Sequence, residues 1–237
     1  MSSNDNRSIY QDLVKVLRKN RHIKDTFEYF LFLFYKVFLS QCKFTYRGKK
    51  YKYFYHRYNA TFTNERSIEI PISKELIDKY RGKDILEVGN VLNRYIHFDH
   101  IVLDKHEIYP GVVNEDVVNY KTDKLFDLII SVSTLEHVGF SMGEKLEPGK
   151  FKKSVSNLIK LLKKDGLFFV TLPMFYNAEI DRLLSRNEMV FQEEYFMKRT
   201  SALNHWVQID KKQALVGPHY NSKYIWGNLI YFGYYYN

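Results

Sequence analysis

From residue 84 onward, short apolar segments alternate with stretches of helical pattern, and this alternation constrains the fold more than any other feature. The apolar segments read ILEV, HIVLD, FDLIISVS and LFFVTLP, with GVVNEDVV as a shorter candidate between the second and the third. Nearly continuous hydrophobicity is typical of central parallel strands, which are buried on both faces. The pattern therefore predicts a doubly wound α/β sheet with helices on both faces.

The segments around the last of these strands complete the predicted sheet. Phe151, Val155, Leu158, Ile159 and Leu162 fall on one face of a helix that ends near Asp165-Gly166. Further on, MVFQEEYFMKR and YIWGNLIYFGYYY are strand candidates that would close the sheet with a hairpin-like edge. We expect a Rossmann-like, seven-stranded, mostly parallel sheet over residues 81–237.

Residues 1–80 are predicted to form a separate helical and basic-aromatic cover region. Residues 8–42 have a mainly helical pattern, and their most apolar run, 29–39, is too short to cross a bilayer and contains Lys36. We expect a buried helix there, with an interfacial membrane helix as the alternative. Residues 43–58 predict a strand pair that turns near Gly48, either a solvated basic hairpin over a core or an aromatic cover facing a ligand.

The charge of the chain is concentrated at one end. Residues 1–83 hold 18 Lys and Arg against 8 Asp and Glu, whereas residues 84–237 hold 18 against 19. Such asymmetry keeps an acidic partner, nucleic acid included, among the possibilities. The single cysteine, Cys42, excludes a disulfide framework and a multi-cysteine zinc site, and no signal-peptide pattern precedes the first helix. We expect a cytoplasmic protein without a membrane span and predict no metal.

Polar residues follow the predicted strands where ligands bind in a doubly wound sheet, outside the carboxyl ends. Gly89 follows the first strand and allows close backbone approach, while Glu87 offers an acceptor. Asp104 follows the second strand, spaced to accept both hydroxyls of a ribose, and Asp116 can accept from an adenine amino group. Each of these signals is weak alone, since an Asp after a strand is often only a cap.

Together, over roughly residues 82–177, these elements resemble a class I S-adenosylmethionine-dependent methyltransferase. Glu87-Val88-Gly89 matches the family's Glu-x-Gly element, and FDLIIS, LEHV and LLKKDGLFFVTLP resemble its fourth strand and its helix-turn-fifth strand. The resemblance implies a set of cofactor-binding residues, which are Glu87, Gly89, Asn90, Asp104, Lys105, Asp116, Val117, Ser131 and, for the cofactor carboxylate, Arg66. The alternative for Arg66 is a surface network with Glu65 or Glu69.

The sequence departs from the family motif at Val91 and Asn93, which stand in place of glycines. A nicotinamide dehydrogenase needs such glycines for the approach of a pyrophosphate. S-adenosylmethionine has no phosphate, so the departure favours methyl transfer over hydride transfer.

The chemistry expected after the fourth strand is proton removal from an acceptor. His137 is the first candidate base and Glu136 the second. In the alternative, Glu136 only caps a helix and His137 only packs against the cofactor.

The style of the motifs is similar to methyltransferases associated with surface polysaccharides, so we expect O-methylation of a sugar hydroxyl on a glycan or small molecule. The expected substrate residues are Tyr58, Asn59, Trp206, His219 and Tyr220. RNA methylation by way of the basic N-terminal region, and a silent relative that only binds cofactor, are the alternatives.

Overall fold

The computed structural model describes residues 21–140 and 147–237, and its main element is an eight-stranded sheet. The strands follow one another in the order β5-β4-β3-β6-β7-β10-β8-β9. Their bounds are β3 Ile85–Val88, β4 Ile101–Leu103, β5 Val112–Val113, β6 Phe126–Val132, β7 Leu162–Pro173, β8 Glu193–Arg199, β9 Trp206–Ile209 and β10 Leu229–Tyr236. The strands from β5 to β7 pair in parallel, whereas β10 is antiparallel to both β7 and β8.

The predicted α/β class with a mostly parallel sheet is therefore confirmed, with two differences. The described residues contain eight strands in this sheet, because β9 pairs with the outer side of β8. Only one of its four residues, Trp206, is buried, so its sequence carries no clear strand pattern. The second difference is that β10 lies between β7 and β8 and is not an edge strand.

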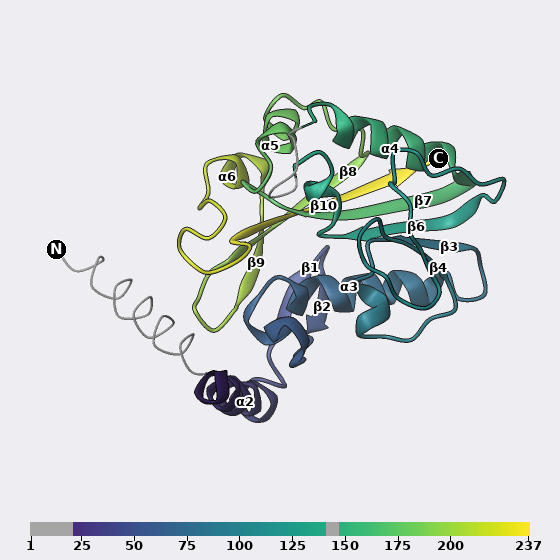
Figure 1. Ribbon diagram of the computed structural model, residues 1–237. Helices are drawn as coiled ribbons and strands as arrows, with labels where there is room; N and C mark the ends of the chain where they lie inside the picture. Colours follow the sequence, from purple (N-terminus) through teal and green to yellow (C-terminus); the bar gives the residue numbers. More distant parts are fainter. Residues whose placement is uncertain (1–20, 141–146) are drawn as a thin grey trace.

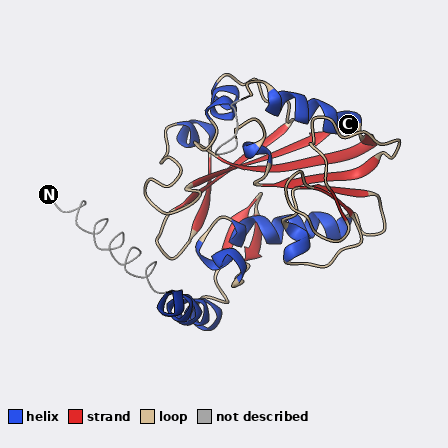
Figure 2. Cartoon of the chain, viewed as in Figure 1, coloured by secondary structure: helices blue, strands red, loops and turns tan. Residues whose placement is uncertain are grey.

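Helices cover both faces of the sheet, as predicted. In Figures 1 and 2, α4 (Lys150–Lys160), α5 (Ala178–Ser185) and α6 (Lys211–Leu215) lie on one side, and α3 (Arg66–Lys79) lies on the other. Alternate residues of β6 separate the two cores. Ile129 packs in the core that contains Phe151 and Leu158 of α4, and Leu128 and Ile130 pack in the core that contains Ile68 of α3.

The N-terminal helix α2 (Arg21–Phe38) confirms the described part of the helical prediction, and residues 8–20 lie outside the described ranges. The expectation that this helix is buried was wrong for one face. Tyr35 is buried, but Phe30, Val37 and Phe38 are exposed. None of the helices in the described ranges is both long and apolar enough to span a membrane.

The predicted hairpin consists of β1 (Lys43–Tyr46) and β2 (Lys49–Lys52), which pair antiparallel. Arg47 and Gly48 form the turn with φ of 50° and 74°, the left-handed pair that two-residue hairpins favour. Phe44 and Tyr46 are buried in the core on the α3 side, while Lys43 and Lys50 are exposed. This arrangement favours the basic hairpin over a core and not the ligand-facing cover.

A proline in α3 leaves a backbone carbonyl free to bind the segment that follows this hairpin. Pro71 has no N–H, so it cannot donate to the carbonyl of Ser67, four residues earlier. That carbonyl instead accepts the N–H of Phe54 at 2.9 Å. Three short 3-10 turns, Tyr58–Thr63, Leu92–Arg94 and Leu135–His137, complete the described elements.

Tyr46 fixes the hairpin on the antiparallel half of the sheet, so its loss should be costly. It is 1% exposed, its hydroxyl lies 2.9 Å from that of Tyr234, and its ring contacts Phe232. We expect Tyr46→Ala to lower the free energy of unfolding by about 3–5 kcal/mol. Urea unfolding measures this, with exposed Lys50→Ala as the control. Equal stabilities of the two variants would show that the hairpin is not anchored through Tyr46.

Candidate functional site

A cavity of about 470 Å³ lies at the carboxyl ends of β3, β4, β5 and β6, where a doubly wound sheet binds its ligands. Segments far apart in the sequence meet there. The lining residues are Val88, Gly89, Leu103, Asp104, Lys105, His106, Glu107, Glu115, Asp116, Val117, Thr134, His137, Val138, Gly139 and Lys150. Gly89, Asp104, Lys105, Asp116, Val117 and His137 among them were predicted from the sequence.

Only glycine fits at position 89, because the turn after β3 lies directly against the segment after β6. The φ of Gly89 is +85°, and a Cβ atom built on it would lie 2.1 Å from Oγ1 of Thr134. Both the backbone conformation and the space therefore exclude an ordinary side chain. The turn after β3 is thus pressed against the segment after β6, and together they form one wall of the cavity.

Glu87 does not line the cavity. Its carboxylate is fully buried, and Oε1 accepts the N–H groups of Val91 and Leu92 at 2.8 and 2.5 Å. Oε2 lies 2.6 Å from Nε2 of His100. Glu87 therefore shapes the turn at Val91, one of the two positions where the methyltransferase motif has glycine, and the sequence alone did not indicate His100 as its partner.

Asp104 lines the cavity, but most of its acceptor capacity serves its own loop. Oδ2 accepts the N–H of Asn90 at 3.0 Å, and Oδ1 accepts those of His106 and Glu107 at 2.9 and 2.8 Å. A carboxylate offers about four acceptor positions, so about one remains. The carboxylate of Asp104 can therefore accept a hydrogen bond from one ligand hydroxyl, whereas the sequence had suggested two.

Asp116 is held by two lysines. Its Oδ1 caps the N–H of Val118 at 3.1 Å, and its Oδ2 lies 3.1 Å from Nζ of Lys150 and 3.7 Å from Nζ of Lys105. Burial opposes ionisation, but the Val118 N–H and the Lys150 ammonium outweigh it and hold the pKa of Asp116 below its ordinary value. Lys150, at the start of α4, was not foreseen, because nothing in the sequence links it to Asp116.

Two other predicted cofactor residues, Ser131 and Asn90, are not among the residues that line the cavity. Ser131 is fully buried and donates its hydroxyl to the carbonyl of Val88 at 3.1 Å. Asn90 is 4% exposed, and its side-chain Nδ2 has no hydrogen-bond partner.

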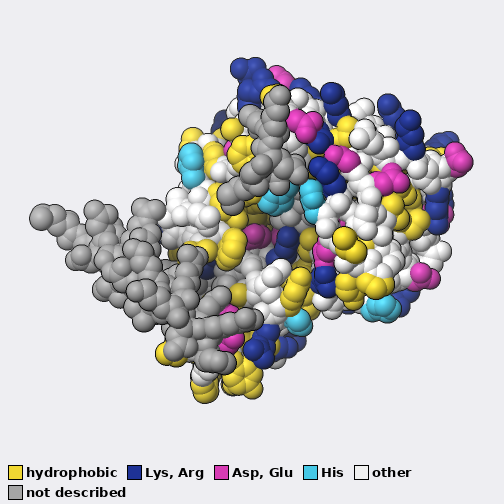
Figure 3. Space-filling model, in the orientation of Figure 1, with side chains coloured by type: hydrophobic (Ala, Val, Ile, Leu, Met, Phe, Trp, Pro, Cys, Tyr) yellow, Lys and Arg dark blue, Asp and Glu magenta, His cyan; other side chains and the backbone are white. Residues whose placement is uncertain are grey.

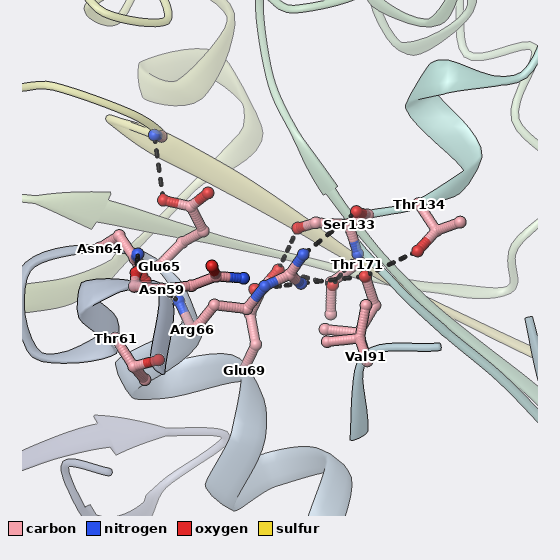
Figure 4. A network of polar contacts seen from close by, with 12 residues as sticks. Asn59, Thr61, Asn64, Glu65, Arg66, Glu69, Val91, Ser133, Thr134 and Thr171 are labelled. Atoms are coloured by element: carbon pink, nitrogen blue, oxygen red, sulfur yellow. Dashed lines mark hydrogen bonds and ion pairs between the residues drawn. The ribbon is translucent and has the colours of Figure 1, made fainter. Parts of the chain in front are cut away.

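Arg66 belongs to a buried polar network at the carboxyl ends of β6 and β7 (Figure 4). Its Nη1 donates to Glu69 at 3.2 Å and to the Val132 carbonyl at 2.9 Å, and its Nη2 donates to the Ser133 carbonyl at 3.3 Å. The network with Glu69 was one of the two alternatives, but it is buried and not on the surface. Although burial opposes its charge, Glu69 and Glu65 raise the pKa of Arg66. Its pairing with a cofactor carboxylate stays a prediction.

The two predicted catalytic residues have opposite surroundings. Glu136 is 2% exposed, its Oε2 has no hydrogen-bond partner, and burial raises its pKa well above the ordinary value. The side chain of His137 is 49% exposed, and its Nδ1 lies 3.0 Å from the hydroxyl of Tyr176. Burial, and after it the charge of Arg66, lowers the pKa of His137. His137 is therefore neutral at neutral pH and can accept a proton.

The predicted substrate residues are not all together. Tyr220 contacts Tyr176 with ring centroids 5.0 Å apart, and Tyr176 contacts His137 at 4.8 Å, so these three rings form a chain beside the cavity. His219 stacks on Phe175 at 4.3 Å.

The other predicted substrate residues have different surroundings. Trp206 is 3% exposed and donates its indole N–H to Asn204, so it belongs to the core. Tyr58 is exposed and contacts Tyr95, and Asn59 has a φ of 51° in the adjoining turn. Tyr176 was missed because an isolated tyrosine after a strand carries no sequence signal.

Across the described ranges, no group of three or more His, Cys, Asp or Glu side chains has an arrangement that could hold a metal ion.

No protein-family model and no curated protein matches the sequence.

Comparison with solved structures gives similar chains at low identity. N-methyltransferase NodS from Bradyrhizobium japonicum WM9 is 13% identical, with 73% of this chain and 96% of that chain covered and a TM-score of 0.46. The structure of NodS in complex with S-adenosyl-l-homocysteine is 14% identical, with 73% of this chain and 91% of that chain covered and a TM-score of 0.42. A SAM dependent methyltransferase from Archaeoglobus fulgidus is 16% identical, with 76% of this chain and 98% of that chain covered and a TM-score of 0.47. None of these likenesses defines a function for this chain.

The contact between Gly89 and Thr134 predicts a specific pattern of stabilities. Gly89→Ala combines a disfavoured φ with a clash, so we expect a loss of about 2–4 kcal/mol in the free energy of unfolding. Thr134→Gly removes the atoms that clash. Gly89→Ala should therefore cost less free energy of unfolding in the Thr134→Gly protein than in the wild type. Thermal and urea unfolding of the four proteins measures the coupling. Strict additivity of the two changes would contradict the close approach.

Proposed function

We propose that this chain is an S-adenosylmethionine-dependent methyltransferase. The observation that carries the proposal is the cavity, because residues predicted as cofactor ligands from three separate segments, after β3, β4 and β5, line it together with the predicted base His137. The cavity also fits the group chemically. Gly89 contributes to its wall, Asp104 retains acceptor capacity for a hydroxyl, and Val117 offers an apolar surface for a flat ring.

Within this proposal the chain positions the reactants, and the bound cofactor supplies an electrophilic methyl group. Asp104 accepts a ribose hydroxyl, and Lys105 and Lys150 keep Asp116 ionised at the other side of the cavity. Thr134 and Gly89 hold the two strand ends together beneath the ligand. His137 lines the same cavity and accepts a proton from the acceptor.

For the acceptor, we propose a sugar hydroxyl on a glycan or related small molecule. The support is twofold. The sequence resembles methyltransferases associated with surface polysaccharides, and the rings of His137, Tyr176 and Tyr220 form an aromatic wall beside the cavity, suited to a sugar ring. Neutral His137 provides the base that a hydroxyl needs, since a hydroxyl must lose its proton to become a strong nucleophile.

Cofactor binding tests the proposal first. We expect S-adenosylhomocysteine to bind in calorimetry, and Asp104→Ala to weaken it by about tenfold or more through lost hydrogen bonds. Asp123→Ala, an exposed carboxyl between β5 and β6, is the matched control. Because Asp104 also holds its loop, Asp104→Asn and a melting curve separate lost contacts from lost structure. Absence of binding, or equal binding by Asp104→Ala, would reject the cavity as the cofactor site.

Turnover and its pH dependence test His137. With labelled S-adenosylmethionine and a panel of glycans, we expect His137→Ala to lower kcat by about 10²–10⁴-fold, much more than it weakens cofactor binding. Since the pKa of His137 is lowered, its neutral form persists to lower pH. In the pH profile, the decrease of kcat on the acid side should therefore lie below a pH of about 6.5. An unchanged kcat in His137→Ala would leave His137 a packing residue, and cofactor binding without any transfer would identify a silent relative.

A further inference from the structure

Three buried carboxyl groups lie close together behind the wall of the cavity, and we call Glu65, Glu69 and Glu136 the carboxyl cluster. All three are 8% exposed or less. Within the described ranges, Arg66 is the cation whose charge acts on both Glu65 and Glu136. Buried carboxylates need compensating charge or hydrogen-bond donors, so three carboxyls against one guanidinium leave a deficit of positive charge.

The donors of the carboxyl cluster are unevenly shared. Glu69 receives the hydroxyls of Ser133 and Thr171, each at 2.6 Å, as well as Arg66. Glu65 receives the N–H of Gly227 at 3.1 Å. Glu136 is different, because its Oε2 has no hydrogen-bond partner among the residues that the structure describes, and its Oε1 lies 3.7 Å from Nε2 of His137. A buried acceptor without a donor requires an explanation, and a ligand that supplies the donor is one.

Aromatic rings follow Glu136 by way of His137, whose ring contacts that of Tyr176 at 4.8 Å. Tyr176 and Tyr220 are in ring contact, and after burial the charge of Glu136 raises the pKa of Tyr176. The charges of Glu65 and Glu136 contribute to the raised pKa of Tyr220 in the same way. Both rings are thus within electrostatic reach of the carboxyls. Figure 3 shows a hollow in the middle of this face, with acidic and basic side chains on its floor and histidines at its rim.

A carboxyl with a free acceptor, within electrostatic reach of two tyrosine rings, has the chemistry of an ammonium site. A bound cation favours the ionised form of Glu136 against the effect of burial, the carboxylate then accepts a charge-assisted hydrogen bond, and aromatic faces attract the same cation. We propose that the acceptor carries a positively charged amino group, bound by Oε2 of Glu136 and faced by the rings of Tyr176 and Tyr220. The proposal rests on the methyl-transfer function above and narrows the acceptor to an amino sugar.

Matched sugars test this proposal. The probes are methyl glycosides of hexoses with one amino group, placed at each ring position in turn, and the same hexoses with a hydroxyl there. Binding to the protein saturated with S-adenosylhomocysteine is measured by calorimetry and by ligand-observed NMR. We expect at least one amino sugar to bind about tenfold more tightly than its hydroxyl counterpart. A panel in which no amino sugar is preferred overturns the proposal.

Variants assign the preference to Glu136. Glu136→Gln keeps the shape and removes the charge, so the amino preference should fall to about twofold or less, with S-adenosylhomocysteine affinity unchanged. Glu75→Gln, an exposed carboxyl on α3 that pairs with Lys49, should keep the preference. Tyr176→Leu leaves the buried charges in place and should also weaken it, which covers a failure of Glu136→Gln to fold.

Two outcomes separate this inference from the proposed function. A preference that survives in Glu136→Gln, or a parallel loss of S-adenosylhomocysteine binding, overturns the ammonium site while methyl transfer stands. Failure of the wild-type protein to bind S-adenosylhomocysteine rejects the proposed function, and the sugar titration is then made on the free protein. Equal binding of amino and hydroxyl sugars there overturns the ammonium site as well.

Discussion

The buried carboxylate of Glu69 is the interaction on which the arrangement of the site depends. It lies one turn inside α3, is fully buried, and accepts from Ser133, Thr171 and Arg66. A carboxylate buried without these donors would be strongly destabilising, so α3 has one favourable position relative to the ends of β6 and β7. The helix that precedes the sheet in the sequence is in this way locked to its functional edge, and Arg66 and Glu65 are placed along with it.

The segment Thr134–His137 divides the site into two chemically different parts. Thr134 and His137 line the cavity, whereas Glu136 is buried on the other side among carboxyls. Neighbouring residues of this tight turn therefore serve different environments. One environment is the cavity with ionised Asp116 and two lysines, and the other is buried and, within the described residues, has Arg66 as the cation beside its carboxyls. A protein that joins two reactants needs such a division, because each reactant must be recognised separately and still meet the other.

The sheet was predictable from the sequence because burial on both faces leaves a continuous apolar run, as in FDLIISV and LFFVTLP. The strand ends were predictable for the same reason, and Gly89, Asp104, Asp116 and His137 follow from them. Side-chain direction was not predictable. Glu87 and Ser131 point inward, and Trp206 lies in the core, because partners such as His100, Val88 and Asn204 are brought near them only by the fold. The eighth strand was missed since WVQI is half exposed and pairs only at the edge.

The position of β10 bears on how the chain acquires its fold during synthesis. Residues 229–236 are made after every other strand, yet they lie between β7 and β8 and pair with both. Until they leave the ribosome, β7 and β8 each have an edge without its neighbour, and β8 and β9 can form only a hairpin apart from the rest. Such late, non-local pairing makes folding slow, and open strand edges favour aggregation in the meantime. The nascent chain therefore exposes two strand edges that β10 covers in the folded protein.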